Sequence, residues 1–183
     1  FMNWLEKCND IKVVAFDVDG TLTDGSIGYG CGSDDDIKFF NIKDGKAIQI
    51  CRSLGIKTAA VTGRGGKANQ KRLTELKVDL ILDKCHNKRE GMLQLCEFFE
   101  VQPHNCLFVG DDLIDLSAFA TCGIAVAVAD AAQEVKDYAD WILDTPGGRG
   151  ALRETVEKLL RITGRWEEVM KPYREFFKDK AEK

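Results

Sequence analysis

Residues 11–24 are Ile-Lys-Val-Val-Ala-Phe-Asp-Val-Asp-Gly-Thr-Leu-Thr-Asp, and this stretch decides how the rest of the chain is interpreted. Val13–Phe16 is a short apolar run of strand-forming residues without polar alternation, which is typical of a strand buried on both faces. The run is followed by Asp17 and Asp19, and then by Gly20. Two carboxylates at a spacing of two can both approach one point beyond the carboxyl end of the strand. Open parallel α/β sheets bind their ligands at that point.

The length and composition are those of one ordinary globular domain over residues 1–183. Hydrophobic residues make up 44% of the chain and charged residues 31%, as is usual for such proteins. The formal charge of −4 argues against nucleic acid or an anionic membrane as a partner. The seven cysteines never form a Cys-x-x-Cys pair, which favours reduced thiols in a cytoplasmic protein. No apolar run is long enough to span a bilayer.

Strands and helices are expected to alternate along the chain. Apolar runs after the first one predict strands at 56–61, 78–82, 105–109, 123–129 and 139–143. Helical patterns separate the strands and follow the last one, over residues 44–54, 67–76, 89–99, 116–121, 131–136 and 151–162. Alternation of this kind predicts an α/β fold with a doubly wound parallel sheet that has helices on both faces.

Two segments lie outside this alternation. Residues 25–40 carry apolar side chains on either side of a Gly/Ser/Asp cluster, which predicts a β-hairpin with an acidic tip at Asp34–Asp36. Residues 164–183 carry apolar side chains at near-helical spacing, and Pro172 interrupts them. This tail is expected either to dock on its own or a neighbouring subunit, or to form a surface helix on its own domain.

Polar side chains follow the expected strands. Thr62 follows the second strand, Lys88 precedes the next helix, and Asp111 with Asp112 follows the fourth strand. Each alone is equally consistent with a turn or a helix cap. Together with the two aspartates of the opening stretch, in this order, they resemble the four signatures of the haloacid dehalogenase-like phosphohydrolases. The resemblance covers residues 12–161.

The aspartates of these motifs would bring four carboxylates into one crevice, where their repulsion has to be offset. A hard divalent cation offsets it, and a site with oxygen ligands and few carboxylates suits Mg²⁺. The predicted metal ligands are Asp17, Asp19, Asp111 and Asp112.

The family resemblance implies a role for each catalytic residue. Asp17 would attack phosphorus and form an aspartyl-phosphate. Asp19 would protonate the leaving alcohol and later deprotonate the hydrolytic water, while its backbone carbonyl reaches the metal. Lys88 would hold the nucleophile and the phosphate together, and Thr62 would donate a hydrogen bond to a phosphoryl oxygen. A dehalogenase has no alkoxide to protonate, so the second aspartate favours a phosphatase or a phosphomutase.

Family members that act on small metabolites usually cover the site with a cap domain, and the intervals between the motifs here hold no insertion large enough for one. An open site suits a macromolecular substrate, or it needs a neighbouring subunit as its lid. The apolar side chains of the hairpin at 25–40 favour a lid formed by assembly. We therefore expect a homo-oligomer, specifically a tetramer.

Shorter motifs resemble one branch of the family, the capless tetrameric phosphatases of 3-deoxy-manno-octulosonate 8-phosphate (Kdo-8-phosphate) in lipopolysaccharide sugar synthesis. The motifs include Phe-Asn-Ile-Lys-Asp-Gly at 40–45, Thr-Gly-Arg at 62–64 and Gly-Gly-Arg-Gly-Ala at 147–151. The resemblance implies a small phosphorylated sugar acid as the substrate. Arg64 and Arg72 would bind its carboxylate, and Lys43 and Asp44 would contact hydroxyl groups. The predicted substrate contacts are Asn41, Lys43, Asp44, Gly45, Gly63, Arg64 and Arg72.

Three alternatives stay open. A sister branch removes the 9-phosphate of a nine-carbon 2-keto-3-deoxy sugar acid, but it carries Glu where this chain has Arg64. A related module in some sialic acid cytidylyltransferases serves assembly without catalysis, although all four signatures are intact here. A phosphatase of protein or nucleic acid is the third, and the negative charge argues against nucleic acid. One departure from the octulosonate branch is Gln49, where that branch carries a basic residue.

Overall fold

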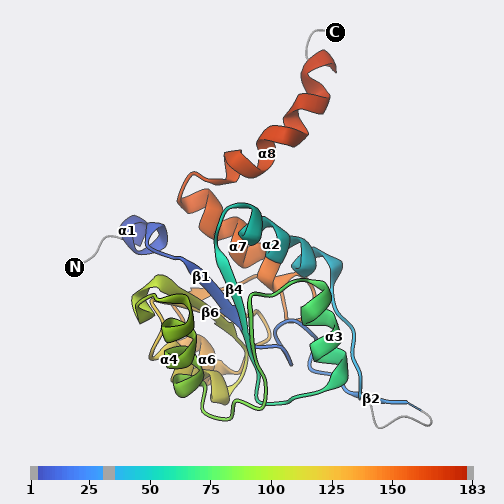
Figure 1. The fold of residues 1–183 in the computed structure, drawn as a ribbon, viewed down its shortest axis with the longest axis vertical. Helices are drawn as coiled ribbons and strands as arrows, with labels where there is room; N and C mark the ends of the chain where they lie inside the picture. Colours follow the sequence, from blue (N-terminus) through green and yellow to red (C-terminus); the bar gives the residue numbers. More distant parts are fainter. Residues whose placement is uncertain (1–3, 31–35, 181–183) are drawn as a thin grey trace.

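A sheet of six parallel strands forms the centre of the protein, whose computed structural model describes residues 4–30 and 36–180 (Figure 1). In spatial order the strands are β5 (Leu80–Leu82), β4 (Lys57–Val61), β1 (Val13–Phe16), β6 (Cys106–Gly110), β7 (Ile124–Ala127) and β8 (Trp141–Ile142). From β1 the chain runs outward through β4 to β5, and it returns to the other side of β1 through β6. This order confirms the predicted doubly wound α/β fold.

Helices cover both faces of the sheet. α2 (Ile42–Ser53) packs against α7 (Ala151–Ile162) on one face, and α4 (Lys88–Phe99) and α6 (Gln133–Asp137) lie on the other (Figure 1). The other helices and 3₁₀ turns are α1 (Trp4–Asn9), α3 (Lys67–Glu75), η1 (Pro103–Asn105), η2 (Leu113–Asp115), α5 (Leu116–Phe119), α8 (Trp166–Arg174) and η3 (Glu175–Lys180). Coverage on both faces explains why the central strands are continuous apolar runs.

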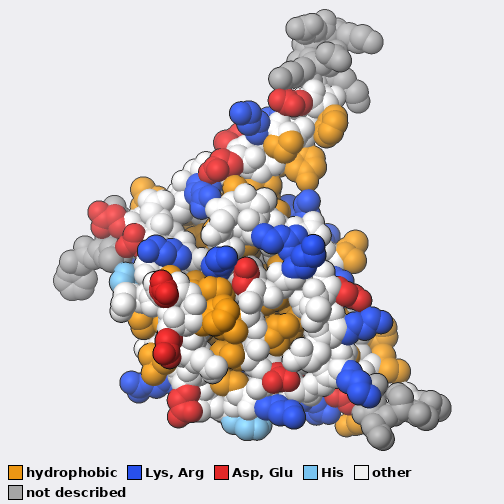
Figure 2. All heavy atoms as spheres, viewed as in Figure 1, with side chains coloured by type: hydrophobic (Ala, Val, Ile, Leu, Met, Phe, Trp, Pro, Cys, Tyr) orange, Lys and Arg blue, Asp and Glu red, His pale blue; other side chains and the backbone are white. Residues whose placement is uncertain are grey.

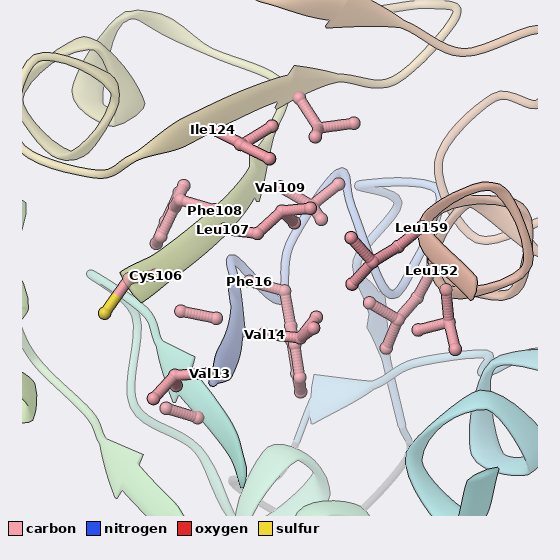
Figure 3. Close-up of a cluster of buried hydrophobic side chains, with 14 of the residues drawn as sticks. Val13, Val14, Phe16, Cys106, Leu107, Phe108, Val109, Ile124, Leu152 and Leu159 are labelled. Carbon is pink, nitrogen blue, oxygen red and sulfur yellow. The ribbon is translucent and has the colours of Figure 1, made fainter. Parts of the chain in front are cut away.

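The hydrophobic core extends over both faces of the sheet, and part of it lies between β1 and α7. Figure 3 shows Phe16 of β1 on the side of the strand where Leu152 and Leu159 of α7 lie, and each of these side chains is 2% exposed or less. All four residues of β1 are buried. Their packing fixes the end of the strand, so that the amide of Asp17 donates to the carbonyl of Val109 at 2.9 Å.

Helix boundaries near the edge of the sheet differ from the expectations. α2 begins earlier because the side chain of Asn41 accepts a hydrogen bond from the Lys43 amide at 2.9 Å and caps the helix. The helix expected at 116–121 begins as predicted but ends at Phe119, and it is preceded by the turn η2, in which the Asp115 carboxylate binds the amides of Asp111 and Asp112. Side-chain hydrogen bonds to the backbone thus set the start of α2 and the turn η2.

The segment between β1 and α2 forms the predicted hairpin, in which β2 (Gly28–Tyr29) runs antiparallel to β3 (Asp36–Ile37). The predicted acidic tip lies mainly at 31–35, outside the described residues. The described residues form no cap domain, as expected. At the carboxyl end, α8 extends away from the body of the protein (Figure 1), and only its first residue, Trp166, is buried.

The surface carries charges of both signs. Figure 2 shows acidic and basic side chains interspersed over one face, with apolar side chains along α8. The six described cysteines are free thiols, which agrees with the expectation of reduced cysteines. None of the helices in the described part of the chain has the length and apolar character needed to cross a bilayer.

Candidate active site

The carboxyl edge of the sheet gathers the polar residues predicted from the sequence. Asp17 follows β1, Thr62 follows β4, Asp111 follows β6, and Lys88 begins α4. Parallel strands end at the same edge, so residues far apart in the chain meet there. Open α/β sheets bind their ligands at this edge.

Lys88 is the central cation of the site. Its side chain is fully buried, and its Nζ lies 2.7 Å from Oδ1 of Asp17 and 2.5 Å from Oδ1 of Asp115. Burial alone would lower the pKa of this ammonium group, but the two carboxylates outweigh burial and raise the pKa. Lys88 is therefore charged, and it fixes the Asp17 carboxylate at the end of β1.

Asp115 connects Lys88 to the turn after β6. Its Oδ1 faces Lys88, while its Oδ2 accepts hydrogen bonds from the amides of Asp111 at 2.8 Å and Asp112 at 3.2 Å. Asp111 in turn accepts a hydrogen bond from the Thr21 hydroxyl at 3.0 Å. Asp115 is entirely buried, and it positions both the cation and the Asp111 carboxylate.

Burial and mutual repulsion raise the pKa of two carboxyl groups. Burial raises the pKa of Asp17 to about 6; Asp115 adds to this effect and Lys88 partly offsets it. Burial also raises the pKa of Asp111 to about 8, and the charges of Asp17 and Asp115 contribute. The protein alone thus disfavours the fully ionised set, so three adjacent carboxylates require positive charge in addition to Lys88.

The carboxylates of this site fit a divalent cation. Oxygen atoms of Asp17, Asp111 and Asp115 lie within 4.8 Å of one another, and a group of oxygen donors suits Mg²⁺. Oδ2 of Asp19 is buried and has no hydrogen-bond partner within the described chain, which also indicates a missing partner. Asp112, predicted as a ligand, is instead exposed and its carboxylate caps η2. Among the described residues, Asp115 belongs to the group of carboxylates that could hold a metal ion, and Asp112 lies outside it.

Asp19 has a cation of its own. Its Oδ1 lies 2.5 Å from Nζ of Lys38, whose side chain is fully buried although it belongs to the arm that leads from β3 to α2. The neighbours of Lys38 show the reverse pattern, because Ile37 is 46% exposed and Phe39 is 75% exposed. The lysine therefore faces the site, and the apolar residues beside it face outward.

Lys38 and Asp115 are the two site residues that the sequence-based prediction missed. The signal for Asp115 is its place four residues after Asp111 in the motif Gly-Asp-Asp-Leu-Ile-Asp. The signal for Lys38 is weaker, since a lysine between apolar residues in a hairpin is usually exposed to solvent. Its burial follows from the tertiary contact with Asp19.

The loop before α7 packs on the turn that follows Asp19. A Cβ on Gly147 would lie 1.7 Å from the carbonyl oxygen of Gly20, so only glycine allows this approach. A Cβ on Gly150 would come within 3.7 Å of the Lys43 side chain. The glycine-rich loop thus joins the turn after β1 to the start of α2.

Thr62 is buried at the end of β4, where its hydroxyl donates to the Arg64 carbonyl at 3.2 Å. A Cβ on Gly63 would meet Cδ1 of Ile114 at 3.3 Å, which shows how closely this loop packs on η2. The side chain of Arg64 turns toward the hairpin instead. Its Nη2 and Nε lie 3.0 and 3.1 Å from Oδ2 of Asp36 in β3.

The remaining predicted substrate contacts lie in α2 and α3. Lys43 is exposed, whereas Asp44 is 1% exposed and accepts a hydrogen bond from the Arg153 amide at 3.0 Å. A Cβ on Gly45 would lie 3.1 Å from Nη2 of Arg72, whose Nε is buried and lacks a hydrogen-bond partner among the described residues. Lys43 therefore faces solvent, and Asp44, Gly45 and Arg72 are mostly enclosed.

Comparisons with known proteins agree with this geometry. The model of the haloacid dehalogenase-like hydrolase family matches residues 80–152. The 3-deoxy-D-manno-octulosonate 8-phosphate phosphatase KdsC of Haemophilus influenzae is 36% identical over 160 residues, which cover 87% of this chain and 88% of that protein.

Two solved structures show the same fold. The cobalt-bound phosphatase from Haemophilus influenzae has a TM-score of 0.83 at 36% identity, covering 86% of this chain and 92% of that one. The 3-deoxy-D-manno-octulosonate 8-phosphate phosphatase from Moraxella catarrhalis, in complex with magnesium, phosphate and KDO, has a TM-score of 0.88 at 30% identity. The match covers 92% of this chain and 97% of that one.

The fold, the acidic site at the carboxyl edge and these similarities define a haloacid dehalogenase-like hydrolase. The chain belongs to this family and, within it, to the phosphatases that include KdsC. The magnesium and cobalt ions of the relatives agree with the oxygen donors that Asp17, Asp111 and Asp115 offer here.

Proposed function

We propose that this chain hydrolyses 3-deoxy-D-manno-octulosonate 8-phosphate to 3-deoxy-D-manno-octulosonate and phosphate, with Mg²⁺ as its metal. The observation that carries the proposal is the buried Lys88–Asp17 contact of 2.7 Å beside the carboxylates of Asp111 and Asp115. The choice of substrate is supported by 36% identity to a relative of that activity. A second relative contains the sugar, phosphate and magnesium together.

Asp17 is the proposed nucleophile. One of its carboxylate oxygens bonds to phosphorus while the bond from phosphorus to the sugar oxygen breaks, which gives an aspartyl-phosphate. Lys88 orients this carboxylate and offsets negative charge on the transferring group. Asp17, Asp111, Asp115 and the Asp19 carbonyl would hold Mg²⁺, which when bound neutralises charge on the phosphoryl oxygens.

Asp19 is the proposed acid and base. It gives a proton to the sugar oxygen as that oxygen leaves. It then takes a proton from the water that attacks the aspartyl-phosphate, which releases phosphate and restores both aspartates. The Thr62 hydroxyl, buried at the end of β4, is the proposed donor to a phosphoryl oxygen.

Arg64 is the proposed partner of the sugar carboxylate. Its planar guanidinium suits a carboxylate, and in this structure it binds that of Asp36. Lys43, exposed at the start of α2, is the proposed contact for a hydroxyl group. The other proposed contacts are Asn41, Asp44, Gly45, Gly63 and Arg72.

We also propose that the chain works as a homotetramer in the cytoplasm. Tyr29, Phe39 and Ile42 are between 75% and 83% exposed, and these apolar side chains lie on the hairpin and the start of α2. Closed symmetry would bury them and let a neighbour's hairpin cover a site that no cap covers in the described part of the chain.

Phosphate release from a panel of substrates with Mg²⁺ tests the proposed activity. The panel holds the octulosonate 8-phosphate, a nine-carbon sugar acid 9-phosphate, a sugar phosphate without a carboxylate, and p-nitrophenyl phosphate. We expect kcat/KM to be highest for the octulosonate and to vanish with a chelator. Arg64→Ala should lower it about 10- to 100-fold for the octulosonate, because a hydrogen bond between charged groups is lost, and should spare the substrate without a carboxylate.

The panel also separates the alternatives. A preference for the nine-carbon acid would assign the chain to the sister activity. A chain that releases phosphate from none of the four, with or without Mg²⁺, would contradict the proposal.

A further inference from the structure

We propose that Lys38 is a positioning residue for Asp19, an inference that rests on the proposed role of Asp19 as acid and base. Nζ of Lys38 lies 2.5 Å from Oδ1 of Asp19. The side chain of Lys38 is 0% exposed and that of Asp19 is 21% exposed. The contact joins two separate segments, the arm after β3 and the turn after β1.

The burial of Lys38 needs an explanation. Its neighbours Ile37 and Phe39 are 46% and 75% exposed, so this part of the chain lies at the surface. A buried ammonium is unfavourable unless a charge partner compensates it. Asp19 is that partner, and the ion pair holds the arm over the turn that carries Asp19.

The two carboxylate oxygens of Asp19 have different surroundings. Oδ1 is occupied by Lys38, whereas Oδ2 is buried and has no hydrogen-bond partner among the described residues. A buried acceptor without a partner is costly, so Oδ2 is the oxygen left for a group from outside the chain. By fixing Oδ1, Lys38 selects Oδ2 as the atom that exchanges a proton with the leaving oxygen.

The hairpin has a second ion pair, and it differs from the first. Arg64 binds Asp36 of β3, but the Arg64 side chain is 47% exposed. This pair ties down the same hairpin without contacting Asp19. Its removal by Asp36→Asn therefore shows what loosening the hairpin does by itself.

The test compares two leaving groups in Lys38→Met. One substrate is an alkyl phosphate without a carboxylate that the wild type hydrolyses, so that its leaving oxygen must be protonated and Arg64, released in Asp36→Asn, has no carboxylate to bind. The other is p-nitrophenyl phosphate, whose leaving group departs as an anion. The ratio kcat/KM reports the steps from free enzyme to the first irreversible one, which includes departure of the leaving group.

We expect kcat/KM for the alkyl phosphate to fall about 10- to 100-fold in Lys38→Met, as is usual when a supporting partner of a functional group is lost. The loss for p-nitrophenyl phosphate should be less than about threefold, because that step needs no proton. Lys38→Arg keeps a cation and should recover most of the loss. Asp36→Asn should change both substrates by the same factor.

Lys57→Met is the matched control, because Lys57 also pairs with an aspartate, Asp79, but at the first residue of β4, the end opposite the site. Lys57→Met should leave kcat/KM unchanged for both substrates. Equal losses on the two substrates in Lys38→Met would overturn the proposal, and so would no loss on either.

The role of Lys38 can be tested even if Lys38→Met does not fold or if the proposed substrate is wrong. If circular dichroism shows that Lys38→Met does not fold, Lys38→Gln, which keeps a donor without the charge, gives the same comparison. If the wild type rejects the octulosonate but hydrolyses another alkyl phosphate, the proposed substrate is wrong, and the two leaving groups still decide the role of Lys38.

Discussion

Two adjacent aspartates after β6 have different surroundings. Asp111 bonds to the Thr21 hydroxyl, and one of its oxygens lies within 4.8 Å of oxygens of Asp17 and Asp115. Asp112 is exposed, and its carboxylate caps η2. Asp111 is therefore the better placed of the two to hold a metal ion.

This difference predicts unequal responses to Mg²⁺. Asp111→Asn should raise the Mg²⁺ concentration for half-maximal phosphate release by at least about tenfold, whereas Asp112→Asn should raise it less than about threefold. Calorimetric titration with Mg²⁺, in the absence of substrate, should show the same order. Equal shifts in the two variants would contradict the assignment of the metal-binding group.

At the scale of single residues, the sequence predicted the positions that depend on strand ends. Asp17, Lys88 and Asp111 meet because parallel strands end at one edge, and that follows from the order of elements. The choice between Asp112 and Asp115 depends on η2, a turn that side-chain hydrogen bonds create. The inward direction of Lys38 depends on Asp19, and no local pattern indicates it.

At the scale of elements, Asp44 joins α2 to α7. It lies in the first turn of α2 and accepts a hydrogen bond from the Arg153 amide near the start of α7. Its other oxygen, Oδ2, is buried and has no hydrogen-bond partner within the described chain. Burial raises the pKa of Asp44 to about 6, although hydrogen bonds from α7 oppose the increase.

This raised pKa predicts how stability changes with pH. The pKa of about 6 exceeds the ordinary value of about 3.9, so the folded state binds more protons than the unfolded chain between these values. The stabilisation from Asp44 is therefore present below about pH 4 and lost as pH rises through about 6. The unfolding free energy of Asp44→Asn minus that of the wild type should therefore increase by on the order of 2 kcal/mol as the pH rises from about 4 to about 7.

Urea unfolding of both proteins across this range measures the difference. Because the other carboxyl groups are common to both proteins, their titration cancels in the comparison. A difference in unfolding free energy that stays constant with pH would show that Asp44 ionises in the folded protein as it does in the unfolded chain.

The elements themselves were largely predictable. Continuous apolar runs located the strands of the sheet, because a strand covered on both faces carries apolar residues at nearly every position. The start of α2 and the turn η2 were not, since they depend on which side chains bind backbone amides. The outward direction of α8 was not predicted either; only its first residue, Trp166, is buried, in contact with Arg153 and Arg161.

At the scale of the whole molecule, the exposed apolar side chains include one pair on the hairpin and one in η3. Tyr29 and Phe39 lie on the hairpin, and Phe176 and Phe177 lie in η3, with exposed fractions from 58% to 80%. Isolated exposed apolar residues are ordinary, but such groups mark interaction surfaces. Assembly of several copies would bury them.

We therefore expect sedimentation velocity to show a tetramer at working concentration. Phe39→Asp should shift the protein toward smaller species and lower its activity on the octulosonate together, since a charge in the interface opposes burial. Tyr138→Asp, at an exposed aromatic residue beyond the hairpin and the tail, is the matched control and should keep the tetramer. A fully active wild-type monomer would remove the support for a lid formed by assembly and favour a macromolecular substrate.

All of the proposed chemistry depends on phosphorylation of Asp17 during turnover. Acid quenching of the wild type with substrate labelled in its phosphoryl group should give labelled protein, and the label should map to the peptide that contains Asp17. Asp17→Asn should fold, bind no label and lose turnover, because the amide cannot attack phosphorus. Turnover by the wild type without labelled protein at any quench time, or near wild-type activity in Asp17→Asn, would contradict the mechanism.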